Sequence, residues 1–338
     1  MTDTRTRTVT QEALVTNGLL VYLFARYRSV RTPFNVYAVN LCLSNLGYLS
    51  FLYPTSLYNE WRPTSSPPSK AFCVFHRFTI HGFRPVIVHT HLLVALNRLW
   101  ALAAPVSYRN YHRSDSLLRP SLICLSIWLY VELFILPGIV IDALSPPSLY
   151  ETVHCSANSC GPNWYLNTGL FLIYDAPLVL FLLIYPVIFA IIFSTSRLRP
   201  GHVSSIQHPT NQTENTATHD GDNHTLRPTS HGEHPVPVTA VTTNSKASCF
   251  GRLAHQSGRQ FMMLTLLTFN VVISLFPAQL YYTLITFGLN PSGMFAVVGT
   301  LYALGCIFDP ILFFISVTTF KEAFRQMFRL HQQPRRYC

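Results

Sequence analysis

The feature that most constrains this chain is a succession of long apolar stretches separated by short polar segments. In one of them 25 residues lead from Cys73 to Arg98, which corresponds to roughly 37 Å of helix at ~1.5 Å per residue. Because the hydrocarbon core of a bilayer is about 30 Å thick, a tilted helix of this length crosses it. Only 11% of the residues are charged, against about 25% in a soluble domain. The sequence therefore predicts an all-α membrane protein.

The basic residues are unevenly distributed over the polar segments. If the segment after the first apolar stretch is cytosolic, 18 of the 24 lysine and arginine residues fall on the cytosolic side. Such an excess of positive charge marks the inner side of membrane proteins. It predicts a multi-pass membrane protein with its N-terminus outside and its C-terminus in the cytosol. The localisation expected is the plasma membrane. The distribution explains the net charge of +10, so we expect the lipid bilayer, and not a nucleic acid, as a partner.

Several short motifs resemble those of rhodopsin-like (class A) G protein-coupled receptors. In that family a cysteine opens the third helix and Asp-Arg-Tyr closes it, and here Cys73 and Asn97-Arg98-Leu99 stand at these places. Residues 40–46, Asn-Leu-Cys-Leu-Ser-Asn-Leu, resemble the Asn-Leu-Ala-x-Ala-Asp-Leu motif of the second helix. Residues 309–313, Asp-Pro-Ile-Leu-Phe, resemble the Asn/Asp-Pro-x-x-Tyr motif of the seventh. Single family positions are matched by Asn17, Trp128, Pro177, Tyr185 and Pro277.

The resemblance covers residues 17–328 and implies a seven-transmembrane helix bundle with a short amphipathic eighth helix at residues 320–325. Residues 198–257 are rich in polar residues and proline and are expected to form a disordered cytosolic loop. The first apolar stretch, residues 13–25, is too short to cross a bilayer, so we expect its N-terminal half to be truncated. The domains expected are a short extracellular N-terminus at 1–12, the receptor domain at 13–328 and a cytosolic tail at 329–338.

Three basic residues of the third stretch occupy positions i, i+4 and i+7, so a helix places them on one face. The resemblance implies that this face lines the ligand cavity. Charged groups at membrane depth are costly and usually functional, and a basic wall suits an anionic small molecule or a peptide with an acidic group. The alternative is an internal ion pair of Arg84 with Asp175 or Glu132. The ligand-binding residues expected are Arg77, His81, Arg84, Asp175, Tyr281 and Tyr282.

Two ligand classes of the family are excluded by single positions. Its amine receptors carry an aspartate seven residues after the cysteine of the third helix, where this chain has Ile80. Its opsins carry a lysine seven residues before the proline of the seventh helix, where this chain has Ala303. We therefore expect neither an amine salt bridge nor a retinal Schiff base, and no cofactor is predicted.

Arg98 is the central residue of the activation switch that the resemblance implies. A guanidinium is always charged and has five donors, which suits a resting contact first and contact with a G protein afterwards. The neighbouring acid of the family is Asn97 here, which can hydrogen-bond but cannot neutralise the arginine, so we expect a weaker resting state. The switch and coupling residues expected are Asn97, Arg98, Tyr185, Pro277, Asp309, Pro310 and Phe313.

Asn45 and Asp309 carry an amide and a carboxylate where the family usually has the two exchanged. We expect them to bridge the second and seventh helices, because a buried carboxylate must be paired, hydrogen-bonded or protonated. Ile87 replaces a serine of the family's sodium site, so we expect weak sodium binding or none. His89 and His91 lie about 200° apart on a helix, so one metal ion cannot bind both, and no metal site is predicted.

The eight cysteines contain no Cys-x-x-Cys pair, which argues against a zinc or redox site. The resemblance implies a disulfide from Cys73 to Cys155 or Cys160, with Cys160 favoured because the run to Trp164 resembles one in peptide receptors. It also implies a receptor that transduces an extracellular peptide or chemosensory ligand to heterotrimeric G proteins. The alternatives are a polytopic membrane transporter or a membrane enzyme. The chain shows no internal repeat and no Gly-x-Ser-x-Gly motif that would favour them.

Overall fold

The computed structural model describes residues 3–61, 69–112, 117–146, 162–197, 265–284, 289 and 294–332. Within these ranges the chain is helical almost throughout and has no β-strand, so the predicted all-α class is confirmed. The loop at 198–257, both candidate disulfide partners Cys155 and Cys160, and the last residues of the tail lie outside the described residues.

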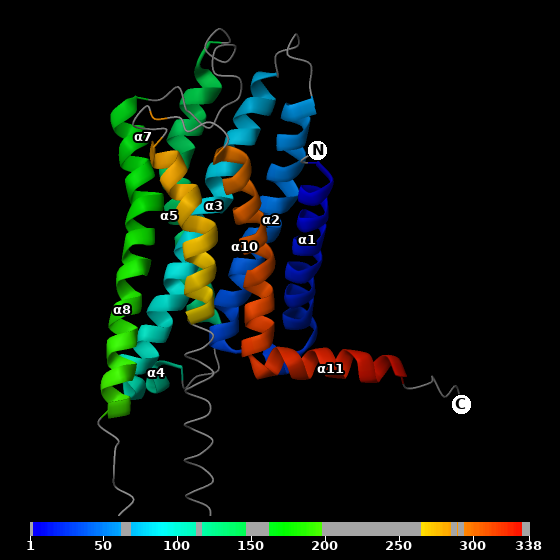
Figure 1. Ribbon diagram of the computed structural model, residues 1–338, viewed down its shortest axis with the longest axis vertical. Helices are drawn as coiled ribbons and strands as arrows, with labels where there is room; N and C mark the ends of the chain where they lie inside the picture. Colours follow the sequence, from blue (N-terminus) through cyan, green and yellow to red (C-terminus); the bar gives the residue numbers. More distant parts are fainter. Residues whose placement is uncertain are drawn as a thin grey trace, which may run out of the picture.

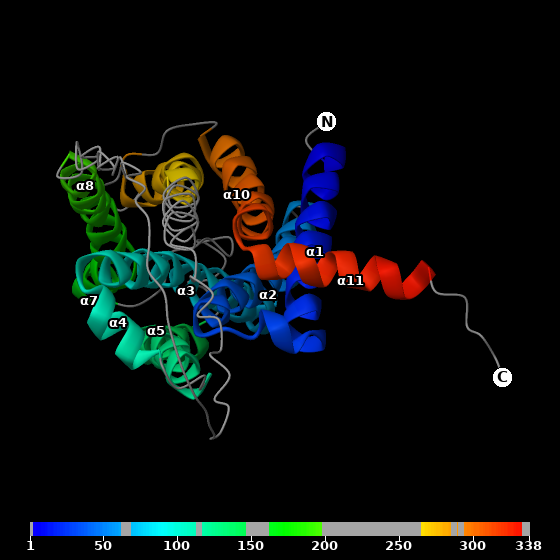
Figure 2. The same ribbon diagram turned by 90° about the horizontal axis from the view of Figure 1, so that it is seen from below.

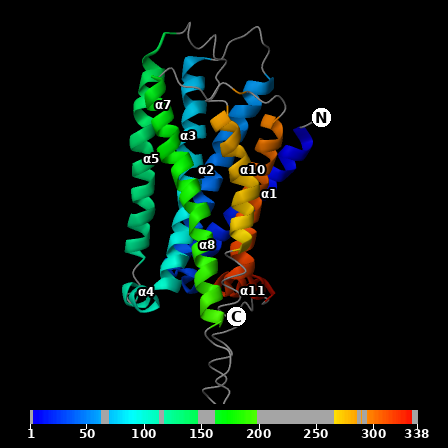
Figure 3. The ribbon, with the colours of Figure 1, turned by 60° about the vertical axis from the view of Figure 1, so that its left-hand side comes forward.

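Seven long helical segments lie side by side in the described part of the chain (Figures 1 and 3). The N-terminal end of α1 and the C-terminal helix α11 lie at opposite ends of this bundle (Figure 1). The long segments are α1 (Asp3–Arg26), α2 (Pro33–Trp61), α3 (Lys70–Ala103), α5 (Leu118–Leu144), the continuous α7 (Asn163–Leu170), η2 (Phe171–Asp175) and α8 (Ala176–Arg197), the helix Thr265–Leu284, and α10 (Met294–Ser316). Shorter elements are η1 (Arg28–Val30), α4 (Pro105–Tyr111) and α11 (Thr318–Gln332).

Five helices of the described part are long and apolar enough to cross a membrane. Their outward faces are apolar too. On α5, Leu129 and Leu133 lie one helical turn apart on the same face and are 63% and 71% exposed. Such a surface is unfavourable in water and suits a bilayer, where helices satisfy their own backbone hydrogen bonds. The five helices are Lys70–Ala103, Leu118–Leu144, Asn167–Ile191, Thr265–Leu284 and Val297–Ser316.

The first helix extends beyond its apolar stretch. The apolar residues cover only 13–25, from which a truncated N-terminal half was expected, and α1 has 24 residues and begins at Asp3. Residues 3–12 contain neither proline nor glycine, so nothing in the backbone stops the helix there. Ala13, Leu20 and Leu23 face the core of the bundle and are at most 2% exposed.

The central element is α3, which lies between α2, α5 and α8 (Figure 2). It begins at a serine cap, in which the hydroxyl of Ser69 accepts a hydrogen bond from the backbone N–H of Phe72 at 3.3 Å. A polar relay ties it to two neighbours. The indole N–H of Trp128 donates to Asn40 at 3.0 Å, and the amide of Asn40 donates to the hydroxyl of Thr90 at 2.8 Å. The relay joins α5, α2 and α3 inside the bundle.

A π-helical turn, η2, interrupts the fifth long segment. Pro177 has no N–H to donate to the carbonyl of Ile173, so the regular helical ladder is broken at this point. The N–H of Ala176 bonds the carbonyl of Phe171, five residues earlier. Such turns are frequent at functional sites, and this one carries Tyr174 and Asp175.

The predicted amphipathic eighth helix is present as α11, which lies across the end of the bundle (Figures 1 and 2). Phe320 and Ala323 are completely buried, whereas Glu322 and Arg325 on the other face are exposed. The helix runs to Gln332, four residues into the segment expected to be the tail. Its apolar face therefore covers the ends of α1 and α10, against which it packs.

Candidate functional site

From Arg77 onward, every seventh residue of α3 is basic: Arg77, Arg84, His91 and Arg98. Seven residues are almost two turns of a helix, so these side chains form one stripe along α3. The structure gives each of them a different partner, on a different part of the bundle. From the sequence, Arg77, Arg84 and Arg98 are expected to be functional, whereas His91 enters only as a possible metal ligand. Its place in the seven-residue spacing is the signal that could have identified it.

Arg77 makes a buried ion pair with α5. Its Nη1 lies 2.8 Å from Oδ2 of Asp142, and the two side chains are 0% and 1% exposed. The charge of Arg77 is thus balanced inside the bundle. Although Arg77 was expected among the ligand-binding residues, the structure joins it to Asp142, a residue that sequence analysis did not consider.

Arg84 lies among tyrosine rings and is 5% exposed. Its guanidinium carbon is 4.3 Å from the ring centre of Tyr282, 5.4 Å from that of Tyr302 and 5.7 Å from that of Tyr174. These rings come from the helix Thr265–Leu284, from α10 and from η2, and cation–π attraction at these distances is favourable. We call these four residues the Arg84 cluster.

The ion pair considered as an alternative for Arg84 does not form among the described residues. Oδ1 of Asp175 accepts hydrogen bonds from Gln279 at 2.7 Å and from the hydroxyl of Thr283 at 3.3 Å. Glu132 points toward Gly82 on another side of α3, where a Cβ atom would lie 3.6 Å from Oε1 of Glu132. The Arg84 cluster therefore holds a buried guanidinium with aromatic partners and no carboxylate from the described part of the chain.

Two further residues expected in the ligand cavity border this cluster. Nδ1 of His81 lies 3.1 Å from the hydroxyl of Tyr174, and the ring of Tyr281 lies 5.4 Å from that of Tyr282. The hydroxyl of Tyr302 is buried and has no hydrogen-bond partner in the described part of the chain. A buried hydroxyl that lacks a hydrogen-bond partner beside a buried cation is a place where a ligand can supply that partner.

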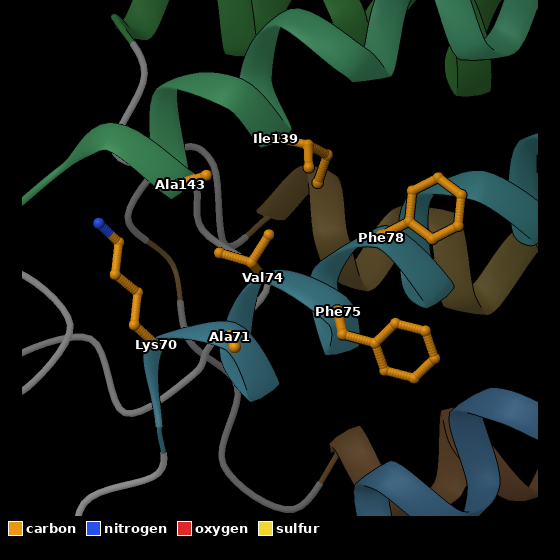
Figure 4. A pocket seen from close by; sticks show the side chains of 7 residues that line it. All are labelled: Lys70, Ala71, Val74, Phe75, Phe78, Ile139 and Ala143. Atoms are coloured by element: carbon orange, nitrogen blue, oxygen red, sulfur yellow. The ribbon is translucent and has the colours of Figure 1, made fainter.

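A groove between α3 and α5 is separate from these residues (Figure 4). It has a volume of about 640 Å³. Its lining is apolar apart from Lys70, and it includes none of the expected ligand-binding residues. The lining residues are Lys70, Ala71, Val74, Phe75, Phe78, Ile139 and Ala143.

The centre of the bundle holds a polar network around Asp309, which is 2% exposed. Oδ1 of Asp309 accepts a hydrogen bond from Asn270 at 2.8 Å, and Oδ2 accepts one from Asn45 at 3.2 Å. Nε2 of His91 lies 3.3 Å from the same Oδ2. The amide of Asn45 also lies 3.3 Å from Oδ1 of Asn17. This network joins five helices, and the structure thereby brings together the pair Asn45 and Asp309 that sequence analysis singled out.

Three of these partners escaped sequence analysis in this role, namely Asn17, His91 and Asn270. Asn17 was recognised only as a motif position, and Asn270 carries no pattern of its own. His91 faces the carboxylate of Asp309 next to Ile87, which is 1% exposed. The described part of the chain contains no group of three or more residues that could hold a metal ion.

Near the C-terminal end of α3, Asn97 and Arg98 point to different partners. The amide of Asn97 donates to the hydroxyl of Tyr108 at 3.3 Å. The guanidinium carbon of Arg98 lies 3.9 Å from the ring centre of Phe34, near the start of α2. Tyr185 packs against Phe181 on α8, with ring centres 4.9 Å apart.

The other residues expected in the switch lie inside helices. Pro277 belongs to the helix Thr265–Leu284, and Pro310 is buried within α10. Phe313 is completely buried, with its ring centre 6.3 Å from that of Phe34. At the other end of α3, Cys73 is buried and disulfide-bonded, and both candidate partners lie outside the described residues.

A family described as 7 transmembrane receptor (rhodopsin family) matches residues 16–313. The chain is 26% identical over 183 residues to the alpha-2B adrenergic receptor of Mus musculus, which covers 52% of this chain and 37% of that receptor. It is 27% identical over 191 residues to melanopsin of Homo sapiens, with 54% and 38% covered. With melanopsin of Felis catus the identity is 29% over 126 residues, with 36% and 24% covered. The chain thus spans less than half the length of these curated relatives.

Proposed function

The chain belongs to the rhodopsin family of seven-transmembrane receptors, and from this premise we propose that it transduces an extracellular, anionic ligand to a heterotrimeric G protein. As a member of this family it is a multi-pass membrane receptor and not an enzyme. The positive-inside distribution of its basic residues supports a plasma-membrane orientation with the N-terminus outside. In that orientation the Arg84 cluster lies nearer the outer side than Arg98, because α3 runs from Cys73 inward.

The observation that carries the ligand proposal is the Arg84 cluster. A buried guanidinium is costly unless it is paired, and the tyrosine rings replace only part of the stabilisation that a carboxylate gives. The unsatisfied hydroxyl of Tyr302 adds a hydrogen-bond donor beside the cation. A ligand carboxylate or phosphate placed there can accept charge-assisted hydrogen bonds from the guanidinium of Arg84 and a hydrogen bond from the hydroxyl of Tyr302. We infer a peptide or a chemosensory small molecule that carries such a group.

The similarity to an adrenergic receptor and to melanopsin does not extend to the two positions that exclude amines and retinal. Ile80 and Ala303 are both apolar and buried, at 9% and 8% exposure. Neither can form a salt bridge with an amine or a Schiff base with an aldehyde. The proposed ligand class therefore rests on the residues of this chain and not on the names of its relatives.

We expect Arg84→Gln to raise the half-maximal concentration of an anionic agonist about 10- to 100-fold, the loss of a charge-assisted contact. The agonist is first found by screening carboxylate- and phosphate-bearing small molecules and peptides against the full chain, with calcium and cyclic-AMP readouts. Lys70→Gln is the matched control, because it removes a positive charge from the same end of α3 outside the cluster. Equal agonist potency in the wild type and in Arg84→Gln at equal surface level contradicts the proposal.

Arg98→Ala tests the coupling half of the proposal and should abolish the response. The structural alternative for Arg84 has its own signature. If Arg84→Asp is retained inside the cell while Arg84→Gln reaches the surface and responds normally, the cluster serves folding and not ligand binding.

We expect Asn97→Asp to lower basal signalling about two- to fivefold, the strength of an ion pair in which Arg98 is partly exposed. The amide of Asn97 is neutral and donates to Tyr108, so it does not neutralise Arg98. A carboxylate at this position attracts the adjacent guanidinium and stabilises the resting state. Basal cyclic-AMP and calcium signals, normalised to surface level, are the measurement, and Asn97→Ala is the neutral control. Equal basal signals in Asn97→Asp and the wild type contradict the prediction.

A further inference from the structure

We propose that Phe34 is the positioning residue that restrains Arg98 in the resting receptor, through the face of its aromatic ring. The inference rests on the proposed function, because it concerns how the coupling arginine is held before activation. The distance from the guanidinium carbon of Arg98 to the ring centre of Phe34 is 3.9 Å, shorter than any of the contacts that Arg84 makes with its three tyrosines. Contacts within about 6 Å over the ring face are attractive.

The local structure fixes Phe34 at this place. It is the second residue of α2, directly after Pro33, whose fixed φ favours the first helical position. The hydroxyl of Thr32 caps the helix by accepting a hydrogen bond from the backbone N–H of Asn35 at 3.3 Å. The side-chain amide of Asn35 donates to the carbonyl of Val30 at 2.7 Å. The backbone that carries the ring is therefore held on both sides.

The ring of Phe34 also contacts α10. Its centre lies 6.3 Å from the ring centre of Phe313, which is completely buried and follows Asp309 by one helical turn. Asn35 adds a hydrogen bond to the hydroxyl of Thr319 at 3.3 Å, at the start of α11. One aromatic side chain thus joins Arg98 on α3 to the end of α10. A displacement of α3 relative to α2 at this end separates Arg98 from the ring, so the contact opposes activation.

The diagnostic experiment replaces Phe34 with phenylalanines that carry one, two or three ring fluorines, in the full chain in cells. Each fluorine withdraws negative charge from the ring face and weakens cation–π attraction while the size of the ring changes little. We expect basal signalling to rise stepwise with fluorine number, to about two- to fivefold, the range of a single contact of this kind. A purely structural role of the ring predicts a flat series, and that outcome overturns the inference.

The same fluorine series at Phe51 is the matched control. Phe51 is also on α2, and within the described part of the chain its ring contacts Phe75 and Phe83, at 6.2 Å and 5.8 Å, and no cation. We expect no trend there. Phe34→Trp should lower basal signalling, because indole is the strongest of the aromatic partners. A rise of equal size in both series contradicts the inference.

A second readout does not depend on signalling. We expect the melting temperatures of purified Phe34→Leu, Arg98→Gln and the double variant to be non-additive, with the double variant losing less than the sum of the single variants. Additive losses overturn the contact. If the wild type couples to no G protein while this cycle is non-additive, the proposed function fails and the contact between Phe34 and Arg98 stands.

Discussion

Asp142→Ala should lower the free energy of unfolding by about 3–5 kcal/mol, because it removes the carboxylate that neutralises a fully buried guanidinium. Arg77 and Asp142 lie 2.8 Å apart at 0% and 1% exposure, so water cannot replace the lost partner without opening the packing of α3 against α5. The measurement is unfolding of the purified receptor in detergent, together with the fraction of receptor that reaches the cell surface. We expect both to fall.

Two variants sharpen this prediction. Glu132→Ala removes another carboxylate from α5, one that is only partly buried and forms no ion pair among the described residues, and it should have a smaller effect. The double variant Arg77→Met with Asp142→Leu should recover most of the lost stability, because apolar residues of similar volume often replace a buried pair without loss. Wild-type stability of Asp142→Ala contradicts the assignment of a buried ion pair.

Asp309→Leu should lower the free energy of unfolding by about 2–5 kcal/mol. It removes the acceptor of Asn270 and of Asn45 and the group that faces His91, and buried donors that lose an acceptor cost about 1–3 kcal/mol each. Asp309→Asn keeps one carbonyl oxygen as an acceptor, so we expect a smaller loss. The same unfolding measurement compares the two variants, and basal signalling reports whether the resting state changes as well.

The contrast between the two substitutions is the decisive part of this test. If Asp309→Leu and Asp309→Asn unfold alike, hydrogen-bond acceptance by residue 309 does not hold the network together. A third variant, His91→Leu, removes one partner only and should fall between the wild type and Asp309→Leu. The network joins helices that are distant in sequence, so its loss should also reduce the cooperativity of unfolding.

Much of the fold could be predicted from the sequence because membrane helices can be recognised from short stretches of it. The apolar run after Cys73 and the amphipathic pattern around Phe320 each depend on a few neighbouring residues, and the structure has a helix at both of them. The extent of α1 could not be predicted in this way. Residues 3–12 are mostly polar and contain no helix-breaking residue, so they carry no local signal for the start of the helix. They are helical because they continue the helix that the apolar residues of α1 form.

In the candidate site, too, local features could be predicted from the sequence and long-range contacts could not. The face of α3 that carries the basic residues follows from the constant period of a helix, so Arg77, His81 and Arg84 could be placed on it without any structure. Their partners could not be foreseen. The sequence offered Asp175 and Glu132 as ion-pair partners of Arg84. In the structure its guanidinium lies instead among tyrosine rings from three other elements.

By itself the sequence determined that this chain is a bundle of membrane helices of the rhodopsin family with a basic stripe on its third helix. Only the tertiary structure decided what each member of the stripe meets, such as Asp142 for Arg77 and Phe34 for Arg98. The physical reason is that the two properties depend on interactions of different sequence range. Helical period is a local property of the backbone, whereas the partner of a buried charge depends on the tilt and rotation of helices that lie far apart in sequence.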